Sequence, residues 1–147
     1  MIRRRKASST PRPTGRRGVT LADLHALAVS FPGVEEGPCY GTPGFRVRGK
    51  FLGRLWEAGD VFVLRTDFDT QEMLLAADPE TFFLTDHYRG YPAILIRLRS
   101  VRANELSRLF EAAWRERATK KLVAELDRTR GEAGRAPAGV ESSALPE

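Results

Sequence analysis

The sequence predicts an α+β domain in which helices pack on a mostly antiparallel sheet. Two observations carry this prediction. Apolar residues recur at helical spacing near both ends of the central region, and the short runs between them alternate apolar with polar residues, as half-buried strands do. The links between these runs are short, which favours antiparallel pairing over parallel crossovers.

A first helix is predicted to begin after Thr20, because Thr20 followed by Asp23 is a capping pattern. Pro32-Gly33 ends it. The apolar residues of this segment fall on one helical face: Leu21, Leu24, Leu27, Ala28 and Phe31.

Three strands are predicted next, after a loop rich in glycine and proline. They cover residues 45–47, 51–56 and 61–66, with a turn at Gly49 and a second turn at residues 57–60. Each run is short and is bounded by turn residues, which is typical of a sheet built from hairpins.

The remaining elements complete the order αβββαβα. Asp69 with Glu72 predicts a cap for a helix that extends to Ala77, and Asp78-Pro79 begins a further helical turn. A loop then leads into a strand at residues 93–98. A long amphipathic helix follows, whose apolar stripe consists of Leu106, Leu109, Phe110, Ala113 and Trp114.

The chain of 147 residues is long enough for one domain with a sizeable core. Residues 1–18 contain seven basic and no acidic side chains and almost nothing apolar, so we expect a disordered basic tail there. Residues 129–147 are expected to form a second disordered tail. The folded domain is therefore assigned to residues 19–128, where basic and acidic side chains nearly balance.

The composition argues against several function classes. The single cysteine, Cys39, rules out an intrachain disulfide, and no apolar run reaches the roughly 18 residues that a membrane span needs. We expect a cytoplasmic monomer without a cofactor. Asp67 and Asp69 lack further ligands at calcium-loop spacing, and Gly41 and Gly44 lack the spacing and the lysine of a phosphate-binding loop, so no metal or nucleotide loop is predicted.

Catalysis is not predicted either. Cys39 as a nucleophile would need a nearby base, and the two histidines, His25 and His87, are distant in sequence. His25 is expected at the edge of the first helix's apolar face, whereas His87 lies in a tyrosine-containing loop that could bind a partner.

Two acid-free basic clusters favour a nucleic-acid partner. One spans residues 46–54 and the other residues 87–102, and alternation along a strand would place Arg46 with Arg48, and Arg97 with Arg99, on single faces. Nearby tyrosines, Tyr40 among them, suit stacking on bases. The alternative is that these are ordinary solvated strand faces. The predicted DNA-binding residues are Arg46, Arg48, Lys50, Arg54, His87, Tyr88, Arg89, Tyr91 and Arg97.

The sequence resembles the MmcQ/YjbR-like family over about residues 20–122. The resemblance rests on Phe31-Pro32-Gly33-Val34-Glu35-Glu36, Gly41-Thr42-Pro43-Gly44-Phe45, Gly49-Lys50 and His87-Tyr88-Arg89-Gly90-Tyr91-Pro92. It implies a double-wing DNA-binding domain without an established enzymatic activity. This chain departs from many relatives by having Tyr91-Pro92-Ala93 where they place a His-Trp pair before the last strand.

Two alternatives to a DNA-binding protein stay open. A small-ligand or protein-interaction module would use a pocket between the loops at residues 39–45 and 86–92. An enzyme of unknown type is the other, although no acid–base pair is apparent.

Overall fold

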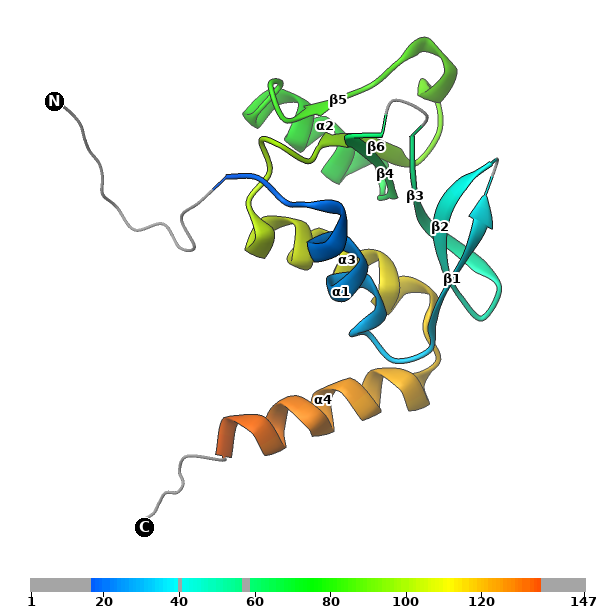
Figure 1. Ribbon diagram of the computed structural model, residues 1–147, viewed down its shortest axis with the longest axis vertical. Coiled ribbons are helices and arrows are strands. Elements are labelled where there is room, and N and C mark those ends of the chain that lie inside the picture. The colour runs from blue at the N-terminus through cyan, green and yellow to red at the C-terminus, as the bar shows by residue number, and fades with distance from the viewer. Residues whose placement is uncertain (1–16, 40, 57–58, 136–147) are drawn as a thin grey trace, which may run out of the picture.

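The computed structural model describes residues 17–39, 41–56 and 59–135, which form a layer of helices on one face of a six-stranded sheet (Figure 1). The elements in chain order are α1 (Leu21–Val29), β1 (Val34–Cys39), β2 (Thr42–Val47), β3 (Lys50–Leu55), β4 (Val61–Arg65), α2 (Phe68–Ala77), β5 (Phe82–Phe83), the 3₁₀ helix η1 (Asp86–Tyr88), β6 (Ala93–Arg97), α3 (Ala103–Arg117) and α4 (Lys120–Arg135).

The sheet is antiparallel throughout, with the strand order β1-β2-β3-β4-β6-β5, so the predicted fold class is confirmed. Strand β1 was expected to be a loop because residues 34–39 read as polar and turn-forming. It is an edge strand that pairs with β2, and an edge tolerates Pro38 and exposed glutamates. The two-residue strand β5 forms the other edge and was also not predicted.

The main core lies between the sheet and helices α1 and α3 (Figure 1). Four phenylalanine rings meet there: Phe110 of α3 lies with its ring centroid 5.4 Å from Phe31, 6.3 Å from Phe45 and 6.5 Å from Phe62. The Trp114 indole Nε1 donates a hydrogen bond to the Pro32 carbonyl at 2.9 Å. The apolar stripe predicted for the long amphipathic helix therefore lies on α3, where it anchors α3 to the segment that follows α1.

The opposite face of the sheet carries a smaller apolar cluster of Val61, Val63, Ala93 and Leu95. Among the described residues, those that pack on this cluster come from outside helices α1 to α4. Partly buried aromatic side chains pack against the cluster, among them Trp56, Phe83 and Tyr88.

One predicted cap is confirmed and the other is wrong by two residues. Thr20 and Asp23 form a reciprocal capping box on α1, as predicted. Helix α2 begins earlier than expected, because Asp67 and not Asp69 accepts the hydrogen bond from the Thr70 backbone N–H at 2.7 Å. These hydrogen bonds to Thr70 lower the pKa of Asp67, since they favour the charged carboxylate.

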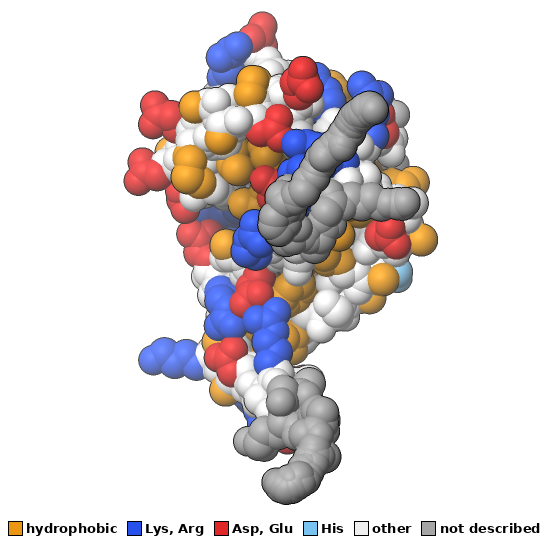
Figure 2. Space-filling model, turned by 90° about the vertical axis from the view of Figure 1, so that its left-hand side faces the viewer, with side chains coloured by type: hydrophobic (Ala, Val, Ile, Leu, Met, Phe, Trp, Pro, Cys, Tyr) orange, Lys and Arg blue, Asp and Glu red, His pale blue; other side chains and the backbone are white. Residues whose placement is uncertain are grey.

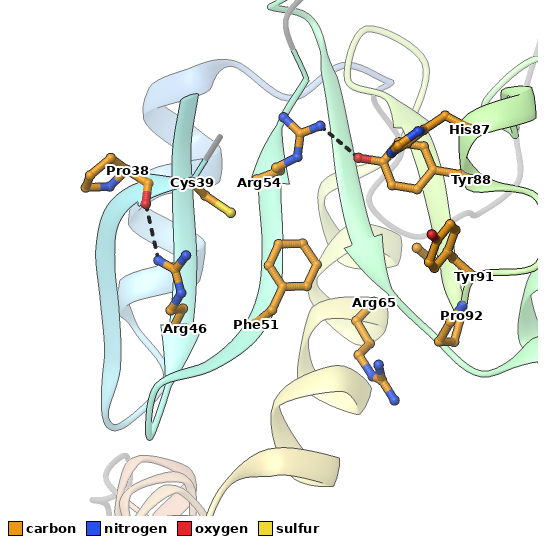
Figure 3. Close-up of a pocket in the computed structure, with 11 residues that line it drawn as sticks. Pro38, Cys39, Arg46, Phe51, Arg54, Arg65, His87, Tyr88, Tyr91 and Pro92 are labelled. Atoms are coloured by element: carbon orange, nitrogen blue, oxygen red, sulfur yellow. Dashed lines mark hydrogen bonds between the residues drawn. The ribbon is translucent and has the colours of Figure 1, made fainter. Parts of the chain in front are cut away.

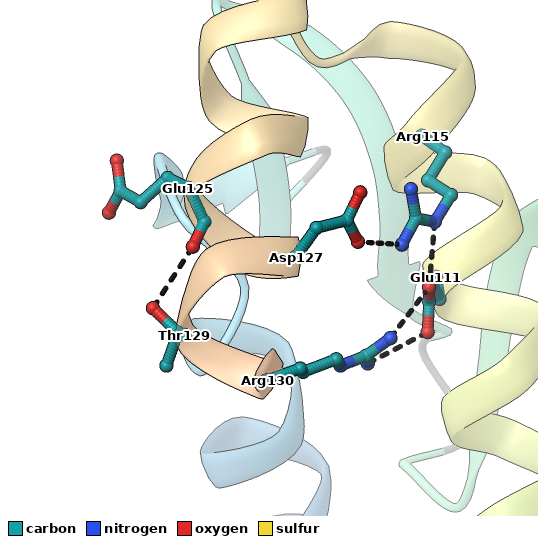
Figure 4. A network of polar contacts seen from close by, with 6 residues as sticks. All are labelled: Glu111, Arg115, Glu125, Asp127, Thr129 and Arg130. Carbon is teal, nitrogen blue, oxygen red and sulfur yellow. Dashed lines mark hydrogen bonds and ion pairs between the residues drawn. The ribbon is translucent and has the colours of Figure 1, made fainter. Parts of the chain in front are cut away.

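The C-terminal boundary predicted at residue 128 is too early, because helix α4 continues to Arg135. A polar network ties α4 to α3 (Figure 4): Arg130 forms two hydrogen bonds with Glu111, and Arg115 bridges Glu111 and Asp127. Hydrogen bonding by Arg130, followed by that of Arg115, lowers the pKa of Glu111 against an opposing effect of burial. The long amphipathic helix is thus followed by a separate second helix, which Thr119 caps at the Leu122 N–H.

The N-terminal boundary also moves, from residue 19 to residue 17. The Gly18 N–H donates to the Val101 carbonyl at 2.8 Å, and the Arg17 guanidinium donates to the Ser100 carbonyl at 2.8 Å. The other residues of the two predicted tails, 1–16 and 136–147, lie outside the described residues. Within the described part of the chain, no helix is long and apolar enough to cross a membrane.

Candidate functional site

A pocket of about 800 Å³ opens on the sheet face that α1 and α3 leave uncovered (Figure 3). The β1–β2 hairpin forms one wall and the loop at residues 86–92 forms the other, with β3 and β4 between them. This is the place where the sequence analysis located its alternative ligand pocket. We call it the arginine pocket, after the three arginines that line it: Arg46, Arg54 and Arg65.

Strand register brings these side chains to one face. Arg46 pairs with Phe51 and Phe45 with Gly53, so Leu52 is an extra residue in β3 and forms a bulge. The bulge lets Leu52 stay in the main core while Phe51 and Arg54 both line the pocket. Alternation along β4 then places Arg65 on the same face as Val63, the cross-strand partner of Arg54.

Arg54 is the buried member of the set, at 5% exposure. Its Nη1 donates to the Thr42 hydroxyl and to the Leu55 carbonyl, both at 3.2 Å, and its Nη2 donates to the Tyr88 hydroxyl at 2.8 Å. Arg54 therefore connects the β1–β2 hairpin, β3 and the 86–92 loop. Its charge contributes to the pocket, while its hydrogen bonds hold Tyr88 in place.

Arg46 and Arg65 are held more loosely and are partly exposed. The Arg46 Nη1 lies 3.4 Å from the Pro38 carbonyl, and the Arg65 Nε lies 3.6 Å from the Glu116 carboxylate. Burial, with the positive charge of Arg65 as the second cause, lowers the pKa of Arg117 on α3. To meet an anion in the pocket, Arg46 gives up only a long contact to a carbonyl, whereas Arg65 must move its buried Nε away from Glu116 of α3.

Aromatic rings line the remaining wall. His87 and Tyr88 come from η1, and Tyr91 follows the turn at Gly90, whose φ of 85° is costly for any residue with a Cβ. The His87 ring centroid lies 4.8 Å from that of Tyr88 and 6.1 Å from that of Tyr91. Gln71 of α2 fixes the loop by donating to the carbonyls of Tyr91 and Ala93 at 2.9 and 2.7 Å.

The expectation that Arg46 and Arg48 share a strand face is wrong. Arg48 lies in the two-residue turn after β2 with a φ of 55°, next to Gly49 with a φ of 75°, and positive φ at both positions is typical of a tight hairpin turn. Its guanidinium lies 3.4 Å from the Arg117 carbonyl. Lys50 is exposed at the start of β3 and does not line the pocket.

The pairing expected for Arg97 and Arg99 is also wrong, because β6 ends at Arg97. Arg97 donates to the Glu80 carbonyl at 2.9 Å and lies over the Phe83 ring at 4.1 Å. Arg99 lies 3.5 Å from Asp60. Arg89, the last of the predicted residues outside the pocket, pairs with Asp86 at 3.0 Å.

The structure thus brings together five of the predicted residues and adds two that the sequence analysis missed. The five are Arg46, Arg54, His87, Tyr88 and Tyr91, and the two additions are Phe51 and Arg65. Phe51 had been taken only as part of a strand, although its position among four basic residues was a usable signal. Arg65 ends an apolar strand and has no basic neighbour in sequence, so nothing local indicated it.

The chemistry of the pocket is that of an anion-binding site with aromatic walls. No carboxylate lies among the described residues that line it. Cys39 and His87 both line it, although no hydrogen bond joins these two side chains. No group of three His, Cys, Asp or Glu suited to a metal ion occurs within residues 17–39, 41–56 and 59–135.

Comparison with known families identifies the family to which the chain belongs. The family model for YjbR matches residues 29–116, which is more than half of the chain. The chain belongs to the YjbR family. This confirms the resemblance on which the sequence analysis relied.

The curated relatives that the chain matches are described as uncharacterised proteins. The chain is 37% identical over 67 residues to the uncharacterised proteins Rv2570 of Mycobacterium tuberculosis and Mb2600 of Mycobacterium bovis. The match covers 45% of this chain and 52% of each relative, so it spans about half of their length.

A solved structure shows the same fold. The crystal structure of Deinococcus radiodurans protein DR2400, with the family-model domain DUF419, aligns with a TM-score of 0.59 over 74% of this chain and 88% of that one. The identity is 21%, so this similarity supports the fold and nothing further.

Proposed function

We propose that this YjbR protein is a non-enzymatic DNA-binding protein and that the arginine pocket is where its domain holds DNA. The observation that carries the proposal is the set of three arginines and adjoining aromatic rings, with no carboxylate among the described lining residues. Arginines suit phosphate oxygens because the guanidinium offers several N–H donors in a planar fork.

The pocket supplies the two kinds of contact that a DNA strand requires. Arg46 and Arg65 supply positive charge for the backbone phosphates, which dominate affinity. The rings of Phe51 and Tyr91 supply apolar surface for bases or sugars. In this proposal the β1–β2 hairpin and the 86–92 loop are the two wings, which flank the bound strand.

The basic N-terminal segment adds a separate, sequence-independent attraction. Seven of the 24 basic residues of the chain lie in residues 1–18 with no acid among them. A mutational test must therefore change the pocket and leave this segment intact, so that its contribution is the same in every variant.

The test is a DNA titration of the full chain at several salt concentrations. Arg46→Gln combined with Arg65→Gln removes two phosphate contacts, so the slope of log K against log salt becomes shallower by about 1.4–1.8, at roughly 0.7–0.9 per contact. The matched control is Arg99→Gln combined with Arg108→Gln, which removes the same charge from exposed residues outside the pocket and outside its two walls.

We expect the control pair to leave the slope within error of the wild type. If both pairs change the slope equally, the protein responds to overall charge and the pocket is not the DNA site. If neither pair changes it, the N-terminal segment accounts for all DNA binding.

A small anionic ligand is the second candidate. The specific observation in its favour is the volume of about 800 Å³, which lies within the roughly 300–1,000 Å³ usual for small-molecule sites. A small anion that binds with high affinity in the absence of DNA, and whose binding the Arg46 and Arg65 substitutions abolish, would favour this function.

A further inference from the structure

We infer that the DNA bound by the arginine pocket is single-stranded, with an unpaired base inserted between Phe51 and the ring of Tyr91. This inference rests on the proposed function and specifies its partner. It follows from the concave shape of the pocket, from the arrangement of arginines and aromatic rings in it, and from the contacts of the arginines that lie outside it.

The shape of the site is concave. Duplex DNA is read by elements that project into a groove, usually a helix or a two-stranded ribbon. Here the charged and apolar groups lie at the bottom of a hollow, where Arg54 and Cys39 are each 5% exposed. A base that is stacked and paired inside a duplex cannot enter such a hollow, whereas an unpaired base can.

The order of side chains fits one nucleotide unit. Figure 3 shows the Phe51 ring on the floor of the pocket, flanked by Arg46 on the adjacent strand and by Arg65, with Tyr91 on the loop across from it. Cations beside aromatic rings are the arrangement that binds single strands, because the cations follow the backbone and the rings stack on bases. Tyr91 is 54% exposed, so its ring is available to a base.

Four of the described arginines outside the pocket lie in turns or at the ends of elements, and not along one helix or strand. Arg48, Arg89, Arg97 and Arg99 each contact a carbonyl or a carboxylate of the domain itself. On the face drawn in Figure 2, acidic and basic side chains are interspersed. What distinguishes the pocket is that it groups three arginine side chains around aromatic rings with no carboxylate among its described lining residues, although Arg65 also contacts Glu116 of α3.

The experiment measures binding of the full chain to fluorescein-labelled strands by anisotropy. The probes are an oligothymidylate, an abasic strand of the same length and charge, and a blunt hairpin duplex. The variants are Phe51→Ala and Tyr91→Ala, with Phe68→Ala as the control, because Phe68 is 53% exposed and does not line the pocket.

Removing one stacking ring should weaken oligothymidylate binding by about 5- to 150-fold, the usual range for a base–aromatic contact. The same two substitutions should have almost no effect on the abasic strand, because it has no base to lose. Tyr91→Phe keeps a ring and should bind as the wild type does, and Phe68→Ala should change neither affinity. Tyr91 lies on a surface loop, so its variants test the inference even if Phe51→Ala destabilises the sheet.

Three results would overturn the inference. The first is an equal loss on the thymidylate and abasic strands, and the second is a duplex affinity that matches the single-strand affinity. In either case the salt-slope test can still succeed, so DNA binding by the pocket would stand while its single-strand character would not. The third is displacement of the strand by free thymidine monophosphate at equal affinity, which would make the pocket a nucleotide site.

Discussion

The hydrogen bond from Arg54 to the Tyr88 hydroxyl can be tested directly by a single substitution. Tyr88→Phe removes the acceptor and keeps the ring, so a buried guanidinium loses a partner that lies 2.8 Å away. Hydrogen bonds to charged groups contribute about 1.5–3 kcal/mol. Because Tyr88 is only partly buried and water can reach its ring edge, we expect a loss at the lower end, about 1–2 kcal/mol.

Equilibrium urea unfolding measures this loss. With a dependence of about 2 kcal/mol per molar urea, the middle of the usual range of about 1–3, the midpoint should fall by roughly 0.5–1 M. The control is Tyr91→Phe, since the Tyr91 hydroxyl has no hydrogen-bond partner among the described residues and its loss should cost under about 0.5 kcal/mol. If the two variants lose the same stability, Arg54 does not hold the 86–92 loop and the account of the pocket wall is wrong.

Two further predictions concern the core and the helical network. Phe110→Ala should lower the free energy of unfolding by about 3–5 kcal/mol, because the ring is fully buried against three others; a loss under about 1 kcal/mol would contradict this packing. Glu111 has a lowered pKa in the folded protein, so its stabilising effect is present above the ordinary glutamate pKa of about 4.3 and is lost as the pH falls through the folded value. Glu111→Gln should therefore reduce stability at neutral pH, and the difference from the wild type should close in acid; a difference that does not depend on pH would contradict the pairing with Arg130.

The sequence predicted the parts of the fold whose residues form their own apolar pattern. The stripe that includes Phe110 and Trp114 is periodic within one helix, and the strand predicted at residues 61–66 begins with a continuous apolar run at residues 61–64. Strand β1 could not be predicted in this way, because its stability comes from pairing with β2 and not from its own burial. Helix α4 was missed beyond residue 128 because its later turns are held by Arg130 and Glu111, which are far apart in sequence.

The candidate site was predicted where one loop or one acid-free basic cluster carried its residues. His87, Tyr88 and Tyr91 lie within one loop, and Arg46 and Arg54 lie on adjacent strands. The assignment failed where it depended on where a strand ends. Arg48 and Arg99 were placed on strand faces, but β2 ends at Val47 and β6 at Arg97, and a residue beyond the last ladder pair no longer follows the alternation.

The central claim is that the folded pocket holds DNA, and not the basic N-terminal segment alone. Mapping backbone amide chemical shifts of the full chain during titration with oligothymidylate tests this most directly. We predict the largest changes at Arg46, Phe51, Arg65 and in the loop at residues 86–92, with little change along α4. Changes confined to residues 1–16, with the pocket residues unmoved, would contradict the claim.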